Sequence, residues 1–145
     1  MSQKLTDTRT RAHGWPSVLI ALLGGGALIF LWRSVISTQI AVGAGSYGVA
    51  VTSVAAAAVW LIGFAGVKHN GRRMRYIAFV AWTVNVLMPL LSFFISGSLA
   101  RTNPWFAAGE TYYYLPTIGS IAALAWLVWS RPAAMAARQL EESKK

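Results

Sequence analysis

Four long apolar stretches limit what this chain of 145 residues can fold into. They cover residues 16–36, 45–67, 76–96 and 113–130. A helix needs about 20 apolar residues to cross the roughly 30 Å hydrocarbon core of a bilayer, and each stretch approaches or exceeds that length. An isolated strand would leave its backbone groups unpaired in lipid, whereas a helix pairs them internally. The sequence therefore predicts an all-α integral membrane protein built as a bundle of four transmembrane helices.

The charged residues predict how these helices are threaded. Only 12% of the residues are charged, against about 25% in ordinary soluble domains. Apart from Arg101, the basic residues outside the apolar stretches form three clusters, at Lys4, Arg9, Arg11; at Lys68, Arg72, Arg73, Arg75; and at Arg131, Arg138, Lys144, Lys145. Loops rich in Lys and Arg stay on the cytoplasmic side, so we expect both termini in the cytoplasm of a cell with a bacterial-type plasma membrane. We expect the clusters to contact anionic lipid headgroups rather than nucleic acid.

The same pattern predicts three regions. Residues 1–15 form a basic cytoplasmic tail, residues 16–130 the transmembrane domain, and residues 131–145 a short cytoplasmic helix or tail. A basic start before an apolar run, with Ala-Val-Gly-Ala at 41–44, also resembles a secretory signal. The run is longer than a usual signal core and ends in Trp32-Arg33, so we interpret it as a retained helix.

Few residues in the sequence are suited to chemistry. The carboxylates all lie outside the apolar stretches, at Asp7, Glu110, Glu141 and Glu142. Proton- or cation-coupled transport generally needs an ionisable group inside the membrane. The chain has no Cys, and neither His13 nor His69 has a neighbouring carboxylate with which to build a metal or haem site. The sequence therefore predicts no catalytic, cofactor or metal site.

The third stretch holds the most polar residues expected inside the membrane. Asn85, Pro89 and Ser92 follow at steps of four and three residues and share one helix face. Pro89 cannot donate a hydrogen bond to the carbonyl of Asn85. We favour hydrogen bonding between helices as the role of this face. The alternative is a ligand or ion pathway at a broken helix.

Small residues predict where helices approach closely. The second stretch carries Gly45, Gly48, Thr52, Ser53, Ala56 and Ala57, and the fourth carries Gly119 and Ala123. In lipid, close packing replaces the hydrophobic driving force between helices. We favour packing inside the bundle, and the alternative is contact with another subunit.

The segment 98–117 joins the third and fourth stretches and carries most of the residues expected on the outer surface. Its aromatic residues and Arg33 are expected near the headgroups, either as an interfacial anchor, which we favour, or as a surface for a partner. The candidates for the partner surface are Arg33, Arg101, Trp105, Glu110, Tyr112 and Tyr113. Arg33 is near enough to the outer surface to extend to it or to pair with Glu110, and Arg101 and Glu110 could close the loop as an ion pair that would contribute little. Trp60, Trp82 and Trp126 are expected in the core, with a lipid- or quinone-binding pocket as the alternative.

Together these features favour a non-catalytic accessory or assembly subunit that packs against a larger membrane complex of respiratory, transport or envelope-synthesis type. One alternative is a small homo-oligomeric transporter or channel with Asn85 and Pro89 on its pathway. The other is a lipid-acting enzyme that uses Arg101 and Glu110, although one carboxylate and one guanidinium make a thin acid–base set.

Overall fold

The computed structural model describes residues 15–69 and 71–144, and all regular elements in them are helical. Three long helices come first: α1 (Trp15–Gly43), α2 (Tyr47–His69) and α3 (Arg72–Ile95). Two 3-10 helices follow, η1 (Ser96–Ser98) and η2 (Phe106–Tyr112), and then α4 (Leu115–Trp129) and α5 (Pro132–Glu142). The basic tail predicted for residues 1–15 lies outside the described residues, except for Trp15 at the start of α1.

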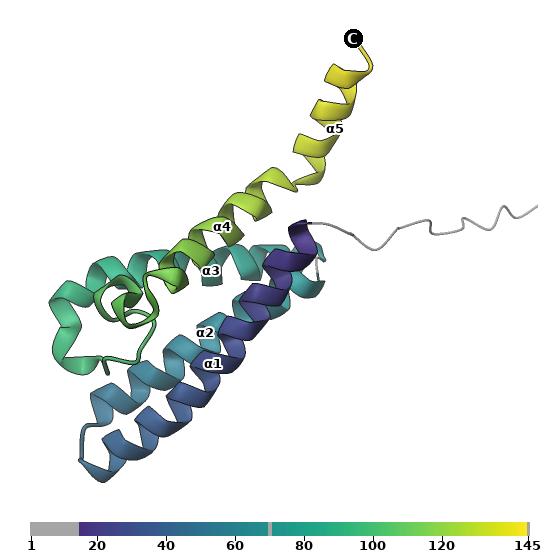
Figure 1. Cartoon of the computed structure of the whole chain (residues 1–145). Coiled ribbons are helices and arrows are strands. Elements are labelled where there is room, and N and C mark those ends of the chain that lie inside the picture. The colour runs from purple at the N-terminus through teal and green to yellow at the C-terminus, as the bar shows by residue number, and fades with distance from the viewer. Residues whose placement is uncertain (1–14, 70, 145) are drawn as a thin grey trace, which may run out of the picture.

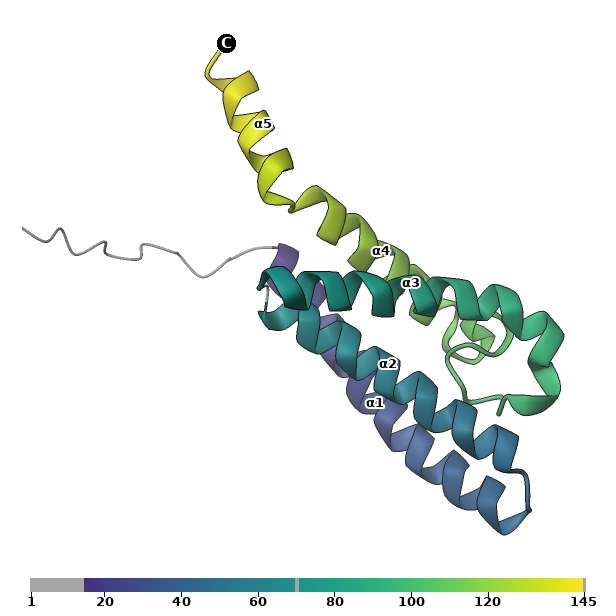
Figure 2. The same cartoon turned by 180° about the vertical axis from the view of Figure 1, so that it is seen from behind.

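Consecutive helices pack side by side, α1 on α2, α2 on α3 and α3 on α4. The α1–α2 hairpin and the α3–α4 pair diverge away from the α2–α3 link, and segment 96–114 lies in the space between them (Figures 1 and 2). α1 and α4 scarcely touch, so this edge of the bundle stays open. α5 projects away from the bundle.

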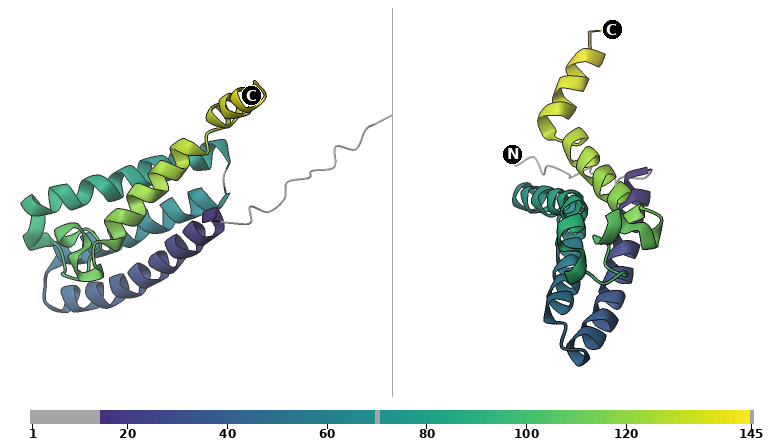
Figure 3. Two further views of the ribbon diagram at one scale, coloured as in Figure 1. Left: turned by 45° about the horizontal axis from the view of Figure 1, so that its top comes forward. Right: turned by 90° about the vertical axis from the view of Figure 1, so that its left-hand side faces the viewer.

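The two ends of the bundle differ in the residues that they carry. The basic end, on the right in the left-hand view of Figure 3, carries the α2–α3 link and the end of α4, with Lys68, Arg72, Arg73, Arg75 and Arg131. The loop end carries the α1–α2 turn and segment 96–114. The three long helices are long and apolar enough to cross a membrane, while α4 is apolar but shorter. These helices indicate a membrane-embedded helical bundle.

The first link is much shorter than predicted, because α1 continues past Ile36 to Gly43. The turn that ends it has Gly45 at φ +71°. The Ser46 N–H donates to Ala41 O (2.7 Å) and the Gly45 N–H to Val42 O (3.0 Å), which is the Schellman pattern of helix termination. Gly45 therefore lies in a turn that needs a left-handed residue. Its predicted place in a packing stripe on the second helix is wrong.

α4 starts later than predicted, at Leu115 rather than at 113 or before. Tyr113 and Tyr114 both have left-handed backbone angles, φ 55° and 61°. Pro116 then lies in the first turn of α4, where its missing N–H is not needed. The 15 residues of α4 rise roughly 22 Å, so this helix alone is shorter than the ~30 Å hydrocarbon core.

Two glycines of α2 let it pack closely against α3. Trp82 is fully buried, and its ring meets that of Trp60 edge to face with centroids 4.8 Å apart. A Cβ added to Gly63 would lie 2.8 Å from the Trp82 ring, and one added to Gly66 would lie 2.6 Å from Ala78 Cβ. The Gly66 Cβ would also lie 2.7 Å from the carbonyl oxygen of Met74. Glycine at these positions allows the two helices to touch.

We predict that Gly66→Ala lowers the free energy of unfolding by about 1–3 kcal/mol, because the added methyl meets backbone atoms that cannot turn away. SDS titration of the purified protein in mixed micelles measures the change. Gly25→Ala is the control, since a Cβ there meets nothing within 4 Å. Equal stability of the two variants would contradict the close approach of α2 and α3.

Candidate functional site

The outer segment folds back into the bundle through Trp105. This side chain is only 4% exposed, and its indole Nε1–H donates to Asn85 Oδ1 at 2.9 Å. It packs in a cluster with Ala56 of α2 and Leu99. Trp105 is therefore an internal anchor between α2 and α3, and its predicted exposure at a docking surface is wrong.

Asn103 makes the second attachment of this segment. Its Nδ2 donates to Thr52 O (3.2 Å), and its Oδ1 accepts the backbone N–H of Trp105 (2.9 Å). The Thr52 hydroxyl donates to Ser98 O at 2.6 Å. An Asn side chain that bonds the backbone two residues on is the usual device of a turn. The Asn103-Pro104 dipeptide is therefore the sequence signal for this attachment.

The ends of the loop are closed by hydrogen bonds to backbone carbonyls. The Thr111 hydroxyl donates to Arg101 O (2.6 Å), and the Tyr112 hydroxyl donates to Thr102 O (2.7 Å). Within the part of the chain that the structure describes, Glu110 forms no ion pair with Arg101 or Arg33. Arg101, Glu110 and Tyr113 are exposed, Tyr113 to 85%.

Arg33 borders a small polar cavity at the loop end. The cavity holds about 10 Å³ and is also lined by Ser34, Ser37, Ser53, Thr102 and Asn103. The hydroxyls of Ser37 and Thr102 are hydrogen-bonded at 2.8 Å. Burial raises the pKa of Tyr112, and the nearby charge of Arg33 acts in the opposite direction. Arg33 thus sits beside neutral hydroxyl groups.

The polar face of α3 is turned inward. Asn85, Pro89 and Ser92 are all buried, and the Ser92 hydroxyl donates to Pro89 O. Asn85 is 2% exposed, and while its Oδ1 accepts from Trp105, its Nδ2 has no hydrogen-bond partner among the described residues. The role of this side chain in the structure is to hold the loop.

The small residues of α2 also contact other parts of the chain. A Cβ at Gly48 would lie 3.5 Å from Ser98 Oγ. Ser53, Ala56 and Ala57 are buried, and Thr52 bonds the outer segment as described above.

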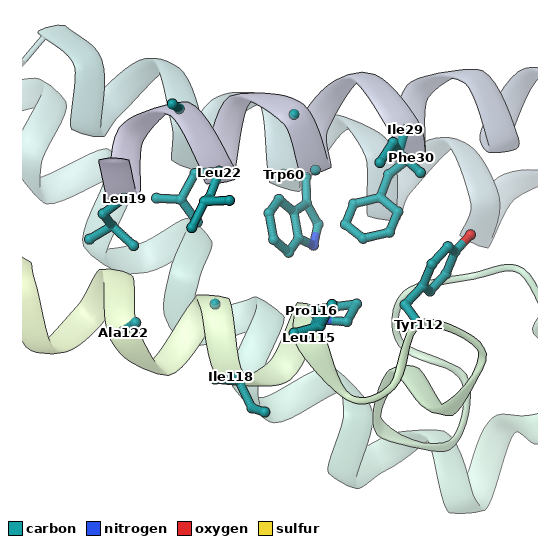
Figure 4. Close-up of a pocket in the computed structure, with 15 residues that line it drawn as sticks. Leu19, Leu22, Ile29, Phe30, Trp60, Tyr112, Leu115, Pro116, Ile118 and Ala122 are labelled. Atoms are coloured by element: carbon teal, nitrogen blue, oxygen red, sulfur yellow. The ribbon is translucent and has the colours of Figure 1, made fainter. Parts of the chain in front are cut away.

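A lateral pocket lies on the open edge between α1 and α4 (Figure 4). Its volume is about 470 Å³, within the range of ligand sites in proteins. Its back wall is aromatic: the Phe30 ring meets Trp60 at 4.7 Å and Tyr112 at 5.1 Å between centroids, both edge to face. The lining is almost wholly carbon and comprises Leu19, Ala21, Leu22, Leu23, Gly25, Gly26, Ile29, Phe30, Trp60, Tyr112, Leu115, Pro116, Ile118, Gly119 and Ala122.

Both helices contribute small residues, besides larger apolar ones, to the lining of the lateral pocket. Ala21 and Gly25 lie on α1, and Gly119 and Ala122 lie on α4. The neighbouring glycines have a different role: a Cβ on Gly24 would lie 3.0 Å from Phe64, and one on Gly26 would lie 3.1 Å from Trp60. Ala123 is fully buried in the core. The pocket is therefore open along the side of the bundle.

Among the three tryptophans expected in the core or in a pocket, only Trp60 lines the lateral pocket. Trp82 lies behind it, and Trp126 is buried with its ring 5.9 Å from the Arg75 guanidinium carbon. Phe30 of α1 and Pro116 of α4 also shape the pocket, and neither was predicted as a site residue. The position of Pro116 depends on where α4 starts, which periodicity did not reveal.

The described residues contain no group of three His, Cys, Asp or Glu side chains that could hold a metal ion. Comparison of the chain with models of protein families, with curated proteins and with solved structures gives no match. Function is therefore argued from the residues.

We predict that Trp105→Phe lowers the free energy of unfolding by about 1–3 kcal/mol, because it leaves Asn85 Oδ1 buried without its donor. Hydrogen–deuterium exchange of residues 100–112 should rise in parallel. Trp32→Phe is the control, since Trp32 is exposed on α1.

The double variant Trp105→Phe with Asn85→Leu tests the cause, because replacing both partners by apolar groups can be nearly neutral. Its loss of stability should be smaller than the sum of the two single losses. Strict additivity would mean that the hydrogen bond contributes nothing to the attachment of the loop.

Proposed function

We propose that the protein is an accessory subunit of a larger membrane complex and that its lateral pocket receives a transmembrane helix of that complex. The open edge between α1 and α4 carries the proposal. Small residues allow helix backbones to approach closely in lipid, and here they are part of the lining of an apolar pocket on both α1 and α4. A helix lying along the open edge would add the contacts that α1 and α4 do not make with each other.

The aromatic back wall supports a defined mode of binding. Phe30, Trp60 and Tyr112 surround a space deep enough for one large apolar side chain of the incoming helix. Edge-to-face aromatic contacts contribute about 0.5–1.5 kcal/mol beyond burial. The expected partner segment is therefore an apolar helix with a small-residue face and one bulky residue at the level of Trp60.

The two alternative functions, a homo-oligomeric transporter or channel and a lipid-acting enzyme, have less support. Asn85 accepts a hydrogen bond from Trp105, which favours a packing role over a place on a transport pathway. Arg101 and Glu110 are both exposed, and among the described residues they form no ion pair with each other. An accessory subunit of a respiratory, transport or envelope-synthesis complex requires neither a transport pathway nor an acid–base pair.

Cysteine-directed cross-linking tests the helix-docking proposal cleanly because the chain has no native Cys. Gly25→Cys and Ala122→Cys, labelled with a photoactivatable maleimide in native membranes, should each yield an adduct with a transmembrane helix of the same co-purifying protein. Leu90→Cys is the control, because Leu90 is exposed on α3 and does not line the lateral pocket.

Gly25→Trp is a second test of helix docking, because its bulky side chain should obstruct the lateral pocket. It should abolish co-purification of the partner while the protein still inserts and folds. Adducts with lipid only, or with a second copy of this chain only, would contradict an accessory role and identify the pocket as an acyl-chain site or a self-association site.

The proposal includes both termini in the cytoplasm of a bacterial-type plasma membrane, supported by the Lys and Arg residues at the basic end. Glu110 and Arg72 are both exposed and lie at opposite ends of the bundle, so each is replaced by Cys in turn. A membrane-impermeant maleimide should label Glu110→Cys in intact cells and Arg72→Cys only after lysis. The reverse labelling pattern would mean that the topology is inverted, and it would leave the helix-docking proposal unaffected.

A further inference from the structure

A second pocket lies at the basic end, between the start of α3 and the end of α4. Its volume is about 270 Å³, and its lining residues are Arg75, Tyr76, Phe79, Leu127 and Arg131. Two of these five side chains are cationic and none is acidic. The arginines are far apart in the sequence, and the packing of α3 on α4 brings both to one cavity. This cavity is called the basic-end pocket below.

Arg75 is held in place by the end of α4. Its Nη2 donates to Leu127 O at 2.8 Å and to Ser130 Oγ at 3.1 Å. Its guanidinium carbon lies 5.9 Å from the centre of the Trp126 ring. These contacts leave the guanidinium at the pocket wall with little freedom to move, which is the condition for selective binding of an anion.

Arg131 approaches the same pocket from the α4–α5 junction. Its guanidinium carbon lies 5.9 Å from the centre of the Phe79 ring. Arg131 is exposed and precedes Pro132, the first residue of α5, whose N-terminus has no side-chain cap and no acidic residue in its first turn. An uncapped helix N-terminus attracts anions, so it adds to the positive potential beside the two arginines.

The remaining walls identify the kind of anion. Tyr76 and Phe79 are exposed aromatic residues, and Leu127 closes the base. Guanidinium groups bind phosphate through paired hydrogen bonds, while the aromatic and aliphatic walls suit the apolar part of the same molecule. A phospholipid offers both at once. Inorganic phosphate would leave the apolar walls without a partner.

We propose that the basic-end pocket binds the phosphate of a phospholipid headgroup, with Arg75 and Arg131 as its two cationic ligands. Arg75 is pre-positioned by α4, and Arg131 closes on the phosphate from the α4–α5 junction. Bound lipid would join α3, α4 and the start of α5. This site does not depend on the helix-docking proposal, since it lies at the other end of α4 and uses different residues.

Native mass spectrometry of the full chain in detergent tests the site with phosphatidylglycerol as the probe. Arg131→Gln should weaken binding of one phosphatidylglycerol molecule by about tenfold, the loss expected for one charge-assisted contact. Arg73→Gln removes the same charge from an exposed residue of α3 that does not line the pocket, and it should bind as the natural chain does. Arg75→Gln also removes the hydrogen bonds of Arg75 to the end of α4. Its affinity for phosphatidylglycerol is therefore compared with that of the natural chain only after its free energy of unfolding has been measured.

Three results would overturn the proposal. Equal weakening by Arg131→Gln and Arg73→Gln would mean diffuse attraction to the whole basic end. Equal binding of diacylglycerol, which has the same acyl chains without the phosphate, would mean that the phosphate is not recognised. Displacement of phosphatidylglycerol by an equal concentration of inorganic phosphate would mean that the site takes free phosphate and not a lipid.

Discussion

The architecture depends on how the backbone of segment 96–114 finds hydrogen-bond partners, because backbone polar groups left unpaired in lipid are costly. Side chains supply several of these partners: Thr52 donates to Ser98 O, Tyr112 donates to Thr102 O, and Asn103 Oδ1 accepts the N–H of Trp105. The Trp105 indole and the Asn103 amide in turn attach the segment to Asn85 and to Thr52 O. The spread of the two hairpins follows from the space that this segment occupies.

The arrangement also explains which parts of the fold were predictable. Apolar length predicted the all-helical membrane bundle, because three of the stretches have the length and composition to cross a bilayer by themselves. The ends of the helices were less predictable. α1 runs seven residues beyond Ile36 because Ser37 to Gly43 contain no residue that stops a helix, and the stop signal is Gly45. α4 begins late because Pro116 follows two left-handed tyrosines, and composition cannot reveal their conformation.

The candidate site was predictable in its residue types but not in its geometry. Asn85 was identified as a polar contact inside the bundle, whereas its partner Trp105 was assigned to the surface, because aromatic residues in a loop commonly lie at headgroup level. An indole needs one acceptor when buried, and α3 supplies that acceptor 20 residues earlier in the chain. Contacts of this range depend on tertiary packing, which no local pattern encodes.

The short α4 links the two proposed sites. Its 15 residues are held at both ends by side-chain hydrogen bonds to backbone carbonyls, Thr117 to Ala108 O near its start and Arg75 to Leu127 O near its end. A helix fixed at its ends and along α3 does not need α1 for support, which is why the α1-facing side remains open without loss of the fold. The hydrogen bond from Arg75 of α3 to Leu127 O of α4 also positions the Arg75 guanidinium in the basic-end pocket. The start of α4 thus contributes apolar residues to the lateral pocket, while its end holds Arg75 of α3 beside Arg131 at the basic-end pocket.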